Sequence, residues 1–212
     1  MKSLVSVVVA ALLFPTVALA DSVPLTKDEV AALKAGGVVT RARALKGEVW
    51  PEVTVLAALP GTPAFSFAAY SDLGSHTRFI PGLLRSDVYR GQQGEEWVQT
   101  EMKLPWPLEN AFCTTRVTSR QEGDTYEMAY TFVEGNHMKD TYGSVRFVPW
   151  DGGTLFVLVS HTTPKSPLAS LWASRVPGEV EAKVKATARH LSRLARVSLS
   201  AVDRGVAKAS PN

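Results

Sequence analysis

Between residues 49 and 165 the chain alternates short segments rich in β-branched and aromatic residues with tight polar turns, and one long amphipathic helix follows. Such short connections can join antiparallel strands, whereas parallel strands need crossovers of a dozen or more residues. The helix carries a continuous apolar stripe, which a sheet has to cover. This order predicts an α+β fold in which a curved antiparallel sheet of about seven strands wraps around the C-terminal helix, an arrangement suited to enclosing an apolar ligand.

The expected strands are divided by residues that favour turns. The first strand is Val49 to Leu59, with Pro51 near its start, where a strand tolerates proline. Glycine-containing turns such as Glu122-Gly123-Asp124 separate the later strands. These later strands are Leu84 to Arg90, Glu95 to Leu104, Ala111 to Arg120, Thr125 to Val133, Thr141 to Val148 and Thr154 to Thr162.

Three short helices are expected before this run of strands is complete. Two of them lie between the first and second strands, and the earlier one begins at Pro63 with Thr62 as its N-cap. The third lies upstream, where Thr26 and Glu29 have the spacing of a capping box. It is expected to end at Gly36, because glycine readily adopts the left-handed conformation that stops a helix.

The main helix is expected from Pro177 to about Ser200, with its apolar side chains on one arc at 100° per residue. Within the strands, as between Thr125 and Val133, apolar residues alternate with polar ones, so one face of the sheet is buried and the other is solvated. The inward residues of sheet and helix are expected to form packed core or the wall of a ligand cavity: Met102, Leu104, Trp106, Met128, Tyr130, Phe132, Phe147, Leu158, Val184 and Leu191.

The N-terminal segment has the pattern of a secretory signal peptide. It joins a positive charge at Lys2 to an apolar run and ends in the small-residue site Ala18-Leu19-Ala20. An uncleaved anchor is the alternative, and Pro15 within the run speaks against it. We therefore expect an exported protein, periplasmic or secreted from a bacterium. The expected parts are the signal peptide (1–20), an N-terminal helix with an extended lead-in (21–48), the main domain (49–200) and a flexible tail (201–212).

The charge distribution bears on the partner. Without Lys2 the chain has 22 basic and 20 acidic residues, which gives no reason to expect nucleic acid as a partner. From Arg175 onward, however, eight basic residues stand against three acidic ones. The basic arc of the main helix is either its solvated face or a peripheral contact with an anionic membrane, and it consists of Lys185, Arg189, Arg193 and Arg196.

The sequence assigns no catalytic residue, and no cofactor or metal is expected. It lacks the motifs of common nucleophile, zinc, phosphate-binding and dinucleotide-binding sites. A metal site built from His137, Asp140 and His161 is a less favoured alternative to ordinary core and surface histidines. Cys113 lies on an expected strand without an adjacent base, so it is expected to act as a small buried apolar side chain rather than as a reactive thiol.

Several short stretches follow one another in a recognisable order: Tyr70-Ser71-Asp72 through Phe79-Ile80-Pro81-Gly82, Met102 to Leu108 leading into Thr114-Thr115-Arg116-Val117, Glu134-Gly135, Tyr142-Gly143-Ser144-Val145 and Asp151-Gly152-Gly153-Thr154. Together with the order of the elements, they resemble the helix-grip layout of the START-related superfamily, in particular its branch of polyketide cyclase/dehydratase and coenzyme Q-binding proteins. The resemblance covers about Val49 to Arg196. It implies a cavity for a hydrophobic ligand between sheet and helix.

Three functional hypotheses follow. The first is an exported carrier of a hydrophobic small molecule, such as a lipid, an isoprenoid or quinone-like compound, or a polycyclic compound. The second is an enzyme of cyclase or dehydratase type, in which Tyr130 or His161 acts as an acid or base on a polyketide-like substrate. The third is a protein-interaction module whose interior is fully packed. A convergent polar pair in the cavity would favour the enzyme.

Overall fold

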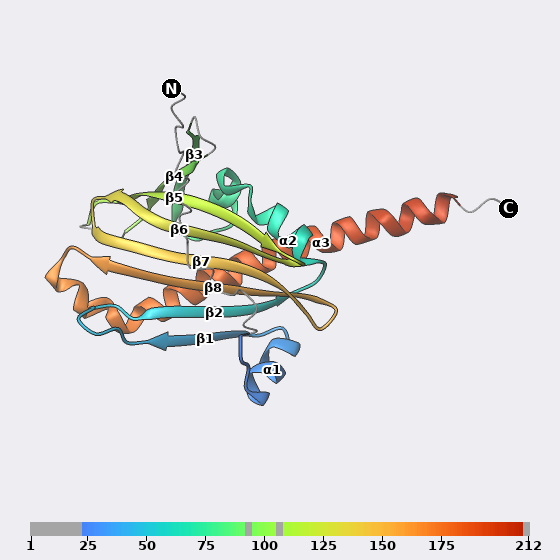
Figure 1. Ribbon diagram of the computed structural model, residues 1–212, viewed down its shortest axis with the longest axis horizontal. Helices are drawn as coiled ribbons and strands as arrows, with labels where there is room; N and C mark the ends of the chain where they lie inside the picture. The colour runs from blue at the N-terminus through green and yellow to red at the C-terminus, as the bar shows by residue number, and fades with distance from the viewer. Residues whose placement is uncertain (1–22, 92–94, 105–107, 210–212) are drawn as a thin grey trace, which may run out of the picture.

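The computed structural model describes residues 23–91, 95–104 and 108–209 (Figure 1). They form an antiparallel sheet with helices on both of its faces, as the sequence predicts for an α+β fold. The expected signal peptide lies outside the described residues. Among the described residues, none of the helices combines the length and the apolar character needed to span a membrane.

The sheet has eight strands in the order β1-β2-β8-β7-β6-β5-β4-β3, and all neighbours are antiparallel. The eighth strand comes from the expected extended lead-in, which pairs with β2 along its whole length. The meander and its turns lie where the sequence predicts them. The strands are β1 (Val38–Arg43), β2 (Glu52–Leu59), β3 (Leu83–Arg90), β4 (Glu96–Met102), β5 (Ala111–Glu122), β6 (Thr125–Gly135), β7 (Met138–Trp150) and β8 (Gly153–Pro164).

The short helices confirm the capping signals. Helix α1 (Lys27–Lys34) begins with the capping box between Thr26 and Glu29. Helix α2 (Pro63–Tyr70) begins with proline and is capped by Thr62. A 3-10 helix, η1 (Leu73–Arg78), follows directly, so two short helices separate β2 from β3.

A second 3-10 helix, η2 (Pro167–Arg175), leads into the long C-terminal helix α3 (Val176–Ala209). Helix α3 begins one residue before the expected start at Pro177 and continues past the expected end near Ser200. It lies along the sheet and its last turns project beyond the other elements (Figure 1).

Each face of the sheet has its own apolar cluster. On the inner face, which α3 covers, Val184 and Leu191 pack against Val55, Phe147 and Phe156. On the outer face, Leu33 of α1 packs against a second set of side chains from β1, β2 and β8, namely Val39, Leu56, Leu155 and Val157. Alternate residues of one strand thus serve opposite faces, which is the period of two that a pleated strand imposes.

Helix α2 and η1 complete the covering of the inner face. Phe67 stacks on Tyr126 of β6, with ring centroids 5.1 Å apart. Tyr70 contacts Phe147 and Phe156, with ring centroids at 5.6 and 5.9 Å. Aromatic contacts of this kind add to the burial of apolar area and fix α2 over the middle of the sheet.

Gly143 in β7 is a position where the sheet has no room for a side chain. A Cβ atom there would lie 2.2 Å from the carbonyl oxygen of Val159 and 2.4 Å from the Tyr130 hydroxyl. We predict that Gly143→Ala lowers the free energy of unfolding by roughly 1 to 3 kcal/mol, because overpacking displaces neighbouring strands. Urea denaturation followed by circular dichroism measures this loss.

The matched control is Gly178→Ala in the first turn of α3, where a Cβ atom meets nothing within 4 Å. Alanine has the higher helix propensity, so this variant should be as stable as the original protein or more stable by up to about 1 kcal/mol. Equal stabilities for the two variants would contradict the close approach of Tyr130 to Gly143.

Candidate functional site

The predicted wall residues divide into two groups. Four of them, Phe147, Met128, Val184 and Leu191, are packed core with at most 4% of their surface exposed. The others that the structure describes are only partly buried: Met102, Leu104, Tyr130, Phe132 and Leu158. Trp106 lies outside the described residues. The two interpretations offered by the sequence, packed core and cavity wall, therefore apply to different parts of the inner face.

Three members of the partly buried group, Met102, Leu104 and Phe132, lie toward one end of the sheet, whereas Leu158 lies in a middle row beside the buried Val55 and Val145. Met102 is the last residue of β4, and Phe132 lies near the end of β6. Tyr130 pairs with Gly143, which in turn pairs with Ser160 of β8. We call Met102, Leu104, Tyr130, Phe132 and Leu158 the open half of the inner face. Strand parity directs Met102, Tyr130, Phe132 and Leu158 inward, and all five side chains remain in partial contact with solvent.

Few polar groups accompany this apolar surface. The Tyr130 hydroxyl hydrogen-bonds the Ser160 side chain, and burial raises the pKa of Tyr130 to about 12. The Thr100 hydroxyl donates to the carbonyl oxygen of Cys113 at 3.2 Å. An apolar surface with a small number of fixed polar groups is typical of sites for hydrophobic ligands.

Lys183 of α3 is the polar residue that the sequence analysis did not select. It is partly buried, and this burial lowers the pKa of its amino group, while Glu179 one turn earlier raises it. At 100° per residue Lys183 lies between Val180 and Ala186, inside the covered arc of the helix. That position in the helical projection was the signal that could have identified it.

His161, one of the proposed acid–base residues, lies on the outer face. Residues of β8 alternate between faces, and His161 has the same parity as Leu155 and Val157, which pack on α1. Its ring contacts Tyr142, and its Nε2 lies 3.5 Å from a carboxylate oxygen of Glu48. The sheet therefore separates His161 from Tyr130 on the inner face.

The alternative metal site also lacks support in the geometry. His137 hydrogen-bonds the carbonyl oxygen of Glu109 at 3.1 Å. Asp140 is exposed near the start of β7, while His161 is buried. Within residues 23–91, 95–104 and 108–209 there is no group of three acidic, histidine or cysteine side chains close enough to bind one ion.

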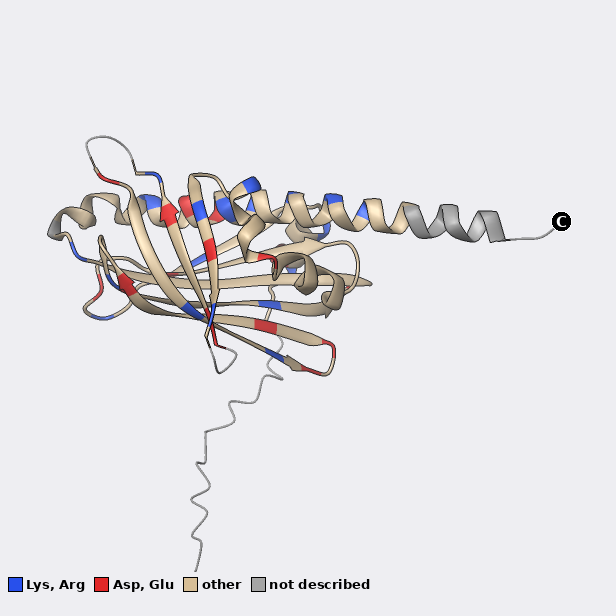
Figure 2. Ribbon diagram, turned by 90° about the horizontal axis from the view of Figure 1, so that it is seen from above, with Lys and Arg blue, Asp and Glu red and all other residues tan. Residues whose placement is uncertain are grey.

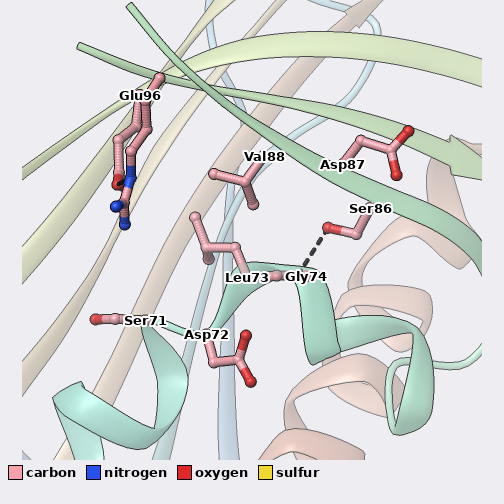
Figure 3. Close-up of a pocket in the computed structure, with 9 residues that line it drawn as sticks. Ser71, Asp72, Leu73, Gly74, Ser86, Asp87, Val88 and Glu96 are labelled. Carbon is pink, nitrogen blue, oxygen red and sulfur yellow. Dashed lines mark hydrogen bonds and ion pairs between the residues drawn. The ribbon is translucent and has the colours of Figure 1, made fainter. Parts of the chain in front are cut away.

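Two open hollows lie away from the predicted wall. One has a volume of about 580 Å³ and lies between the α2–η1 junction and strands β3 and β4 (Figure 3). Asp72, Asp87, Arg90 and Glu96 contribute to its lining, and Ser86 donates a hydrogen bond to Leu73 there. The other, about 650 Å³, is lined by residues of β4, β5 and β6 and of the segment before β4: Glu95, Glu96, Arg116, Val117, Thr118, Ser119 and Thr131. Both linings include charged side chains, and none of the predicted wall residues is among the described residues that form them.

Basic residues recur along α3 (Figure 2), and at 100° per residue Lys185, Arg189, Arg193 and Arg196 share the arc opposite the apolar stripe. Lys185 is paired with Glu181 at 2.5 Å, and a guanidinium nitrogen of Arg193 lies 3.3 Å from Nδ1 of His190. Arg189 and Arg196 are exposed, and neither has an acidic partner among the described residues. Arg193 is likewise exposed without an acidic partner in the described part of the chain, so these three arginines are charges on this face that remain accessible to an anion.

Exposed apolar side chains collect on η2, directly before α3. Leu168 and Leu171 are 64% and 70% exposed, and Trp172 is 39% exposed. The segment is fixed to the body by the hydrogen bond from the Trp50 indole to the Ala169 carbonyl oxygen, 2.9 Å long. Neighbouring exposed apolar residues of this size are uncommon on a soluble surface unless they meet a partner.

No protein-family model matches the chain, and a search of curated protein sequences gives no match. Solved structures do share its fold. A STAR-related lipid transfer protein fragment from Xanthomonas axonopodis is 17% identical, with a TM-score of 0.66 over 73% of this chain and 93% of that one. Human StAR-related lipid transfer protein 5 is 13% identical, with a TM-score of 0.62 over 74% and 83%.

An aromatase/cyclase from a Streptomyces species is 15% identical, with a TM-score of 0.54 over 74% of this chain and 94% of that one. The chain therefore has the helix-grip fold of START-type proteins, as the resemblance predicted. At these identities the likeness concerns the fold, and function has to be argued from the site.

The structure predicts that the Cys113 thiol reacts slowly with thiol reagents. The thiol is buried, and burial raises its pKa to about 11. At pH 8 the thiolate fraction is then about 100-fold below that of a free cysteine. We predict correspondingly slow reaction with Ellman's reagent in the native protein and rapid reaction in 6 M guanidinium chloride. Fast native labelling would show that Cys113 is an accessible thiolate.

Proposed function

We propose that this protein is a non-enzymatic carrier of a hydrophobic small molecule, held on the open half of the inner face next to α3. The observation that carries the proposal is the division of the inner face. Phe147 and Phe156 are sealed in the core, whereas Phe132, Leu158 and Met102 face inward and keep contact with solvent. A ligand that covered these side chains would gain about 25 cal/mol for each square ångström of apolar area removed from water.

The fold relatives support this class of ligand. Proteins of the same fold are described as lipid transfer proteins or as aromatase/cyclases, and the lipids named for the first kind are largely apolar molecules. Export to the bacterial periplasm or the outside belongs to the same proposal and rests on the signal-like sequence of residues 1–20.

The geometry favours a carrier over a cyclase or dehydratase. A catalytic acid or base works best with a pKa near the operating pH. Tyr130, with a pKa of about 12, is neutral at pH 7, and His161 lies on the other face of the sheet. A fully packed interaction module is also less favoured, because its interior would bury the large apolar side chains that the open half leaves in contact with solvent.

Native mass spectrometry tests the proposal. The protein should be purified gently from its own cell envelope, and the bound material extracted with organic solvent and identified. We expect a stoichiometric apolar adduct. A mass of the free protein alone, unchanged after incubation with lipid extract, would contradict the carrier function.

A pair of tryptophan variants locates the site. Thr115 of β5 pairs with Phe132 and shares its face, so Thr115→Trp should fill the open half and weaken ligand binding at least about tenfold. Thr131, next to Phe132, points to the opposite face and lines the 650 Å³ hollow, so Thr131→Trp should bind as before. Binding is measured with the extracted ligand by fluorescence titration. The reverse result would move the site to the 650 Å³ hollow.

The basic face of α3 gives a separate membrane prediction. We propose that Arg189 and Arg196 provide peripheral contact with anionic lipid, since each cation near such a surface contributes about 1 kcal/mol. The double variant Arg189→Glu, Arg196→Glu should lose cosedimentation with phosphatidylglycerol vesicles, and added salt should release the original protein. Leu171→Asp on η2 is the comparison variant. If this change abolishes binding and salt does not, apolar insertion of η2 makes the contact instead.

A further inference from the structure

The direction of the Lys183 side chain follows from the contacts of its neighbours on α3. Glu181 accepts a hydrogen bond from Thr40 of β1 at 2.8 Å, and Val184 packs in the cluster that contains Val55 of β2. On the opposite side, the ring of His190 stacks on Phe79, which follows η1, with centroids 4.2 Å apart. Helix α3 therefore lies between the β1–β2 side of the sheet and the η1 side.

The helical projection places Lys183 between those two contacts. Measured as rotation about the helix axis, Lys183 lies 100° from Val184, on the side of Val184 opposite to Glu181. It lies only about 20° from the direction of His190. Since the sheet continues from β2 through β8 and β7 to β6, this direction runs across the inner face rather than into solvent. Lys183 is also seven residues before His190, so it lies about 10 Å nearer to the start of the helix.

The level of Lys183 along the sheet is close to the open half. Thr40, the partner of Glu181, pairs with Val55, which pairs with Leu158. The next inward row toward the end of β8 contains Ser160 and Tyr130. The backbone of Lys183 is thus near the boundary between the packed core and the open half.

Lys183 has no anionic partner in the described part of the chain. No carboxylate lies within ion-pair distance of its amino group, although Glu179 lies one turn away along the helix. By contrast Lys185, two residues later on the solvated side, is paired with Glu181. A cation that has lost part of its hydration without gaining a counter-ion destabilises the folded protein, so its retention indicates a partner from outside the chain.

We propose that Lys183 binds the acidic head of the carried molecule, and that this molecule is an amphiphile with a single carboxylate and an apolar tail. The tail would lie against Phe132, Leu158 and Met102. This inference rests on the carrier function proposed above. The Tyr130 hydroxyl and Ser160, in the adjoining row of the inner face, could hydrogen-bond the same head.

The single positive charge of Lys183 matches a carboxylate better than a phosphate. One lysine neutralises one negative charge, and the other described residues that line the open half are apolar or neutral. A phosphate monoester would bring close to two negative charges and would leave one of them without a counter-ion in a poorly hydrated site. The predicted ligand class therefore includes fatty acids and other monoacidic amphiphiles.

Displacement of Nile red, a neutral fluorescent probe, by three molecules of the same chain length tests the inference. The molecules are dodecanoate, dodecanol and methyl dodecanoate, all used below their aggregation concentrations. The original protein should prefer dodecanoate over dodecanol at least about tenfold. Lys183→Met should abolish or reverse this preference, because the carboxylate then enters the site without its counter-ion.

Lys185→Met is the matched control, since it removes an equal charge from the solvated side of the same helix, and it should keep the preference for dodecanoate. Lys183→Met should also melt at a higher temperature than the original protein in the absence of ligand, because it removes a desolvated charge. This second measurement shows that the variant is folded.

The outcomes separate the two proposals. Equal displacement by the three molecules, or an unchanged preference in Lys183→Met, overturns the role of Lys183 while the carrier function stands. If neither Nile red nor any of the three molecules binds, the carrier function and the acidic ligand class are both overturned.

Discussion

The mismatch in width between α3 and the sheet is the constraint on which the remaining structure depends. Eight strands about 4.8 Å apart make a sheet roughly 34 Å across, whereas a helix with its side chains is about 10 Å wide. Helix α3 therefore lies over β1 and β2, and its stripe of Val184 and Leu191 packs on inner-face side chains of β2, β7 and β8. Helix α2 and η1 cover part of the remainder through Phe67 and Tyr70. Met102, Leu104 and Phe132, toward the ends of β4 and β6, are the part of the open half that this limited set of helices leaves in contact with solvent, whereas Leu158 borders the core under α3.

This geometry also explains why the polar groups of the inner face are few and specific. Covered strands need apolar side chains on their inner face, so a polar group is retained there only with a partner or for a ligand. Tyr130 has Ser160 as its partner, and the absence of a side chain at Gly143 makes space for its ring. Lys183 has no partner of opposite charge among the described residues. The contrast between these two residues is the basis for distinguishing a structural polar group from a ligand-binding one.

Local patterns predicted what depends on local physics. The alternation of β6 identified Met128 and Tyr130 as inward, and both are on the inner face, while Thr26 and Thr62 cap their helices as expected. The strand β1 was ambiguous because its six residues, with two arginines, show little periodicity. The division of the inner face could not be predicted, since it depends on which strands α3 crosses. For the same reason His161 and Tyr130 could be joined in one hypothesis, although parity within β8 places them on opposite faces.

The features that point to function are those that stability alone would not retain. Replacing a desolvated, unpaired lysine by an apolar residue, or filling the open half with larger side chains, would each stabilise the isolated protein. The chain instead keeps Lys183 inside the covered arc of α3 and keeps Phe132 and Leu158 in partial contact with water. A ligand with an acidic head and an apolar tail removes both sources of instability together, because its charge satisfies the lysine while its tail buries the apolar surface. Ligand binding and folding stability are therefore coupled through the same few side chains.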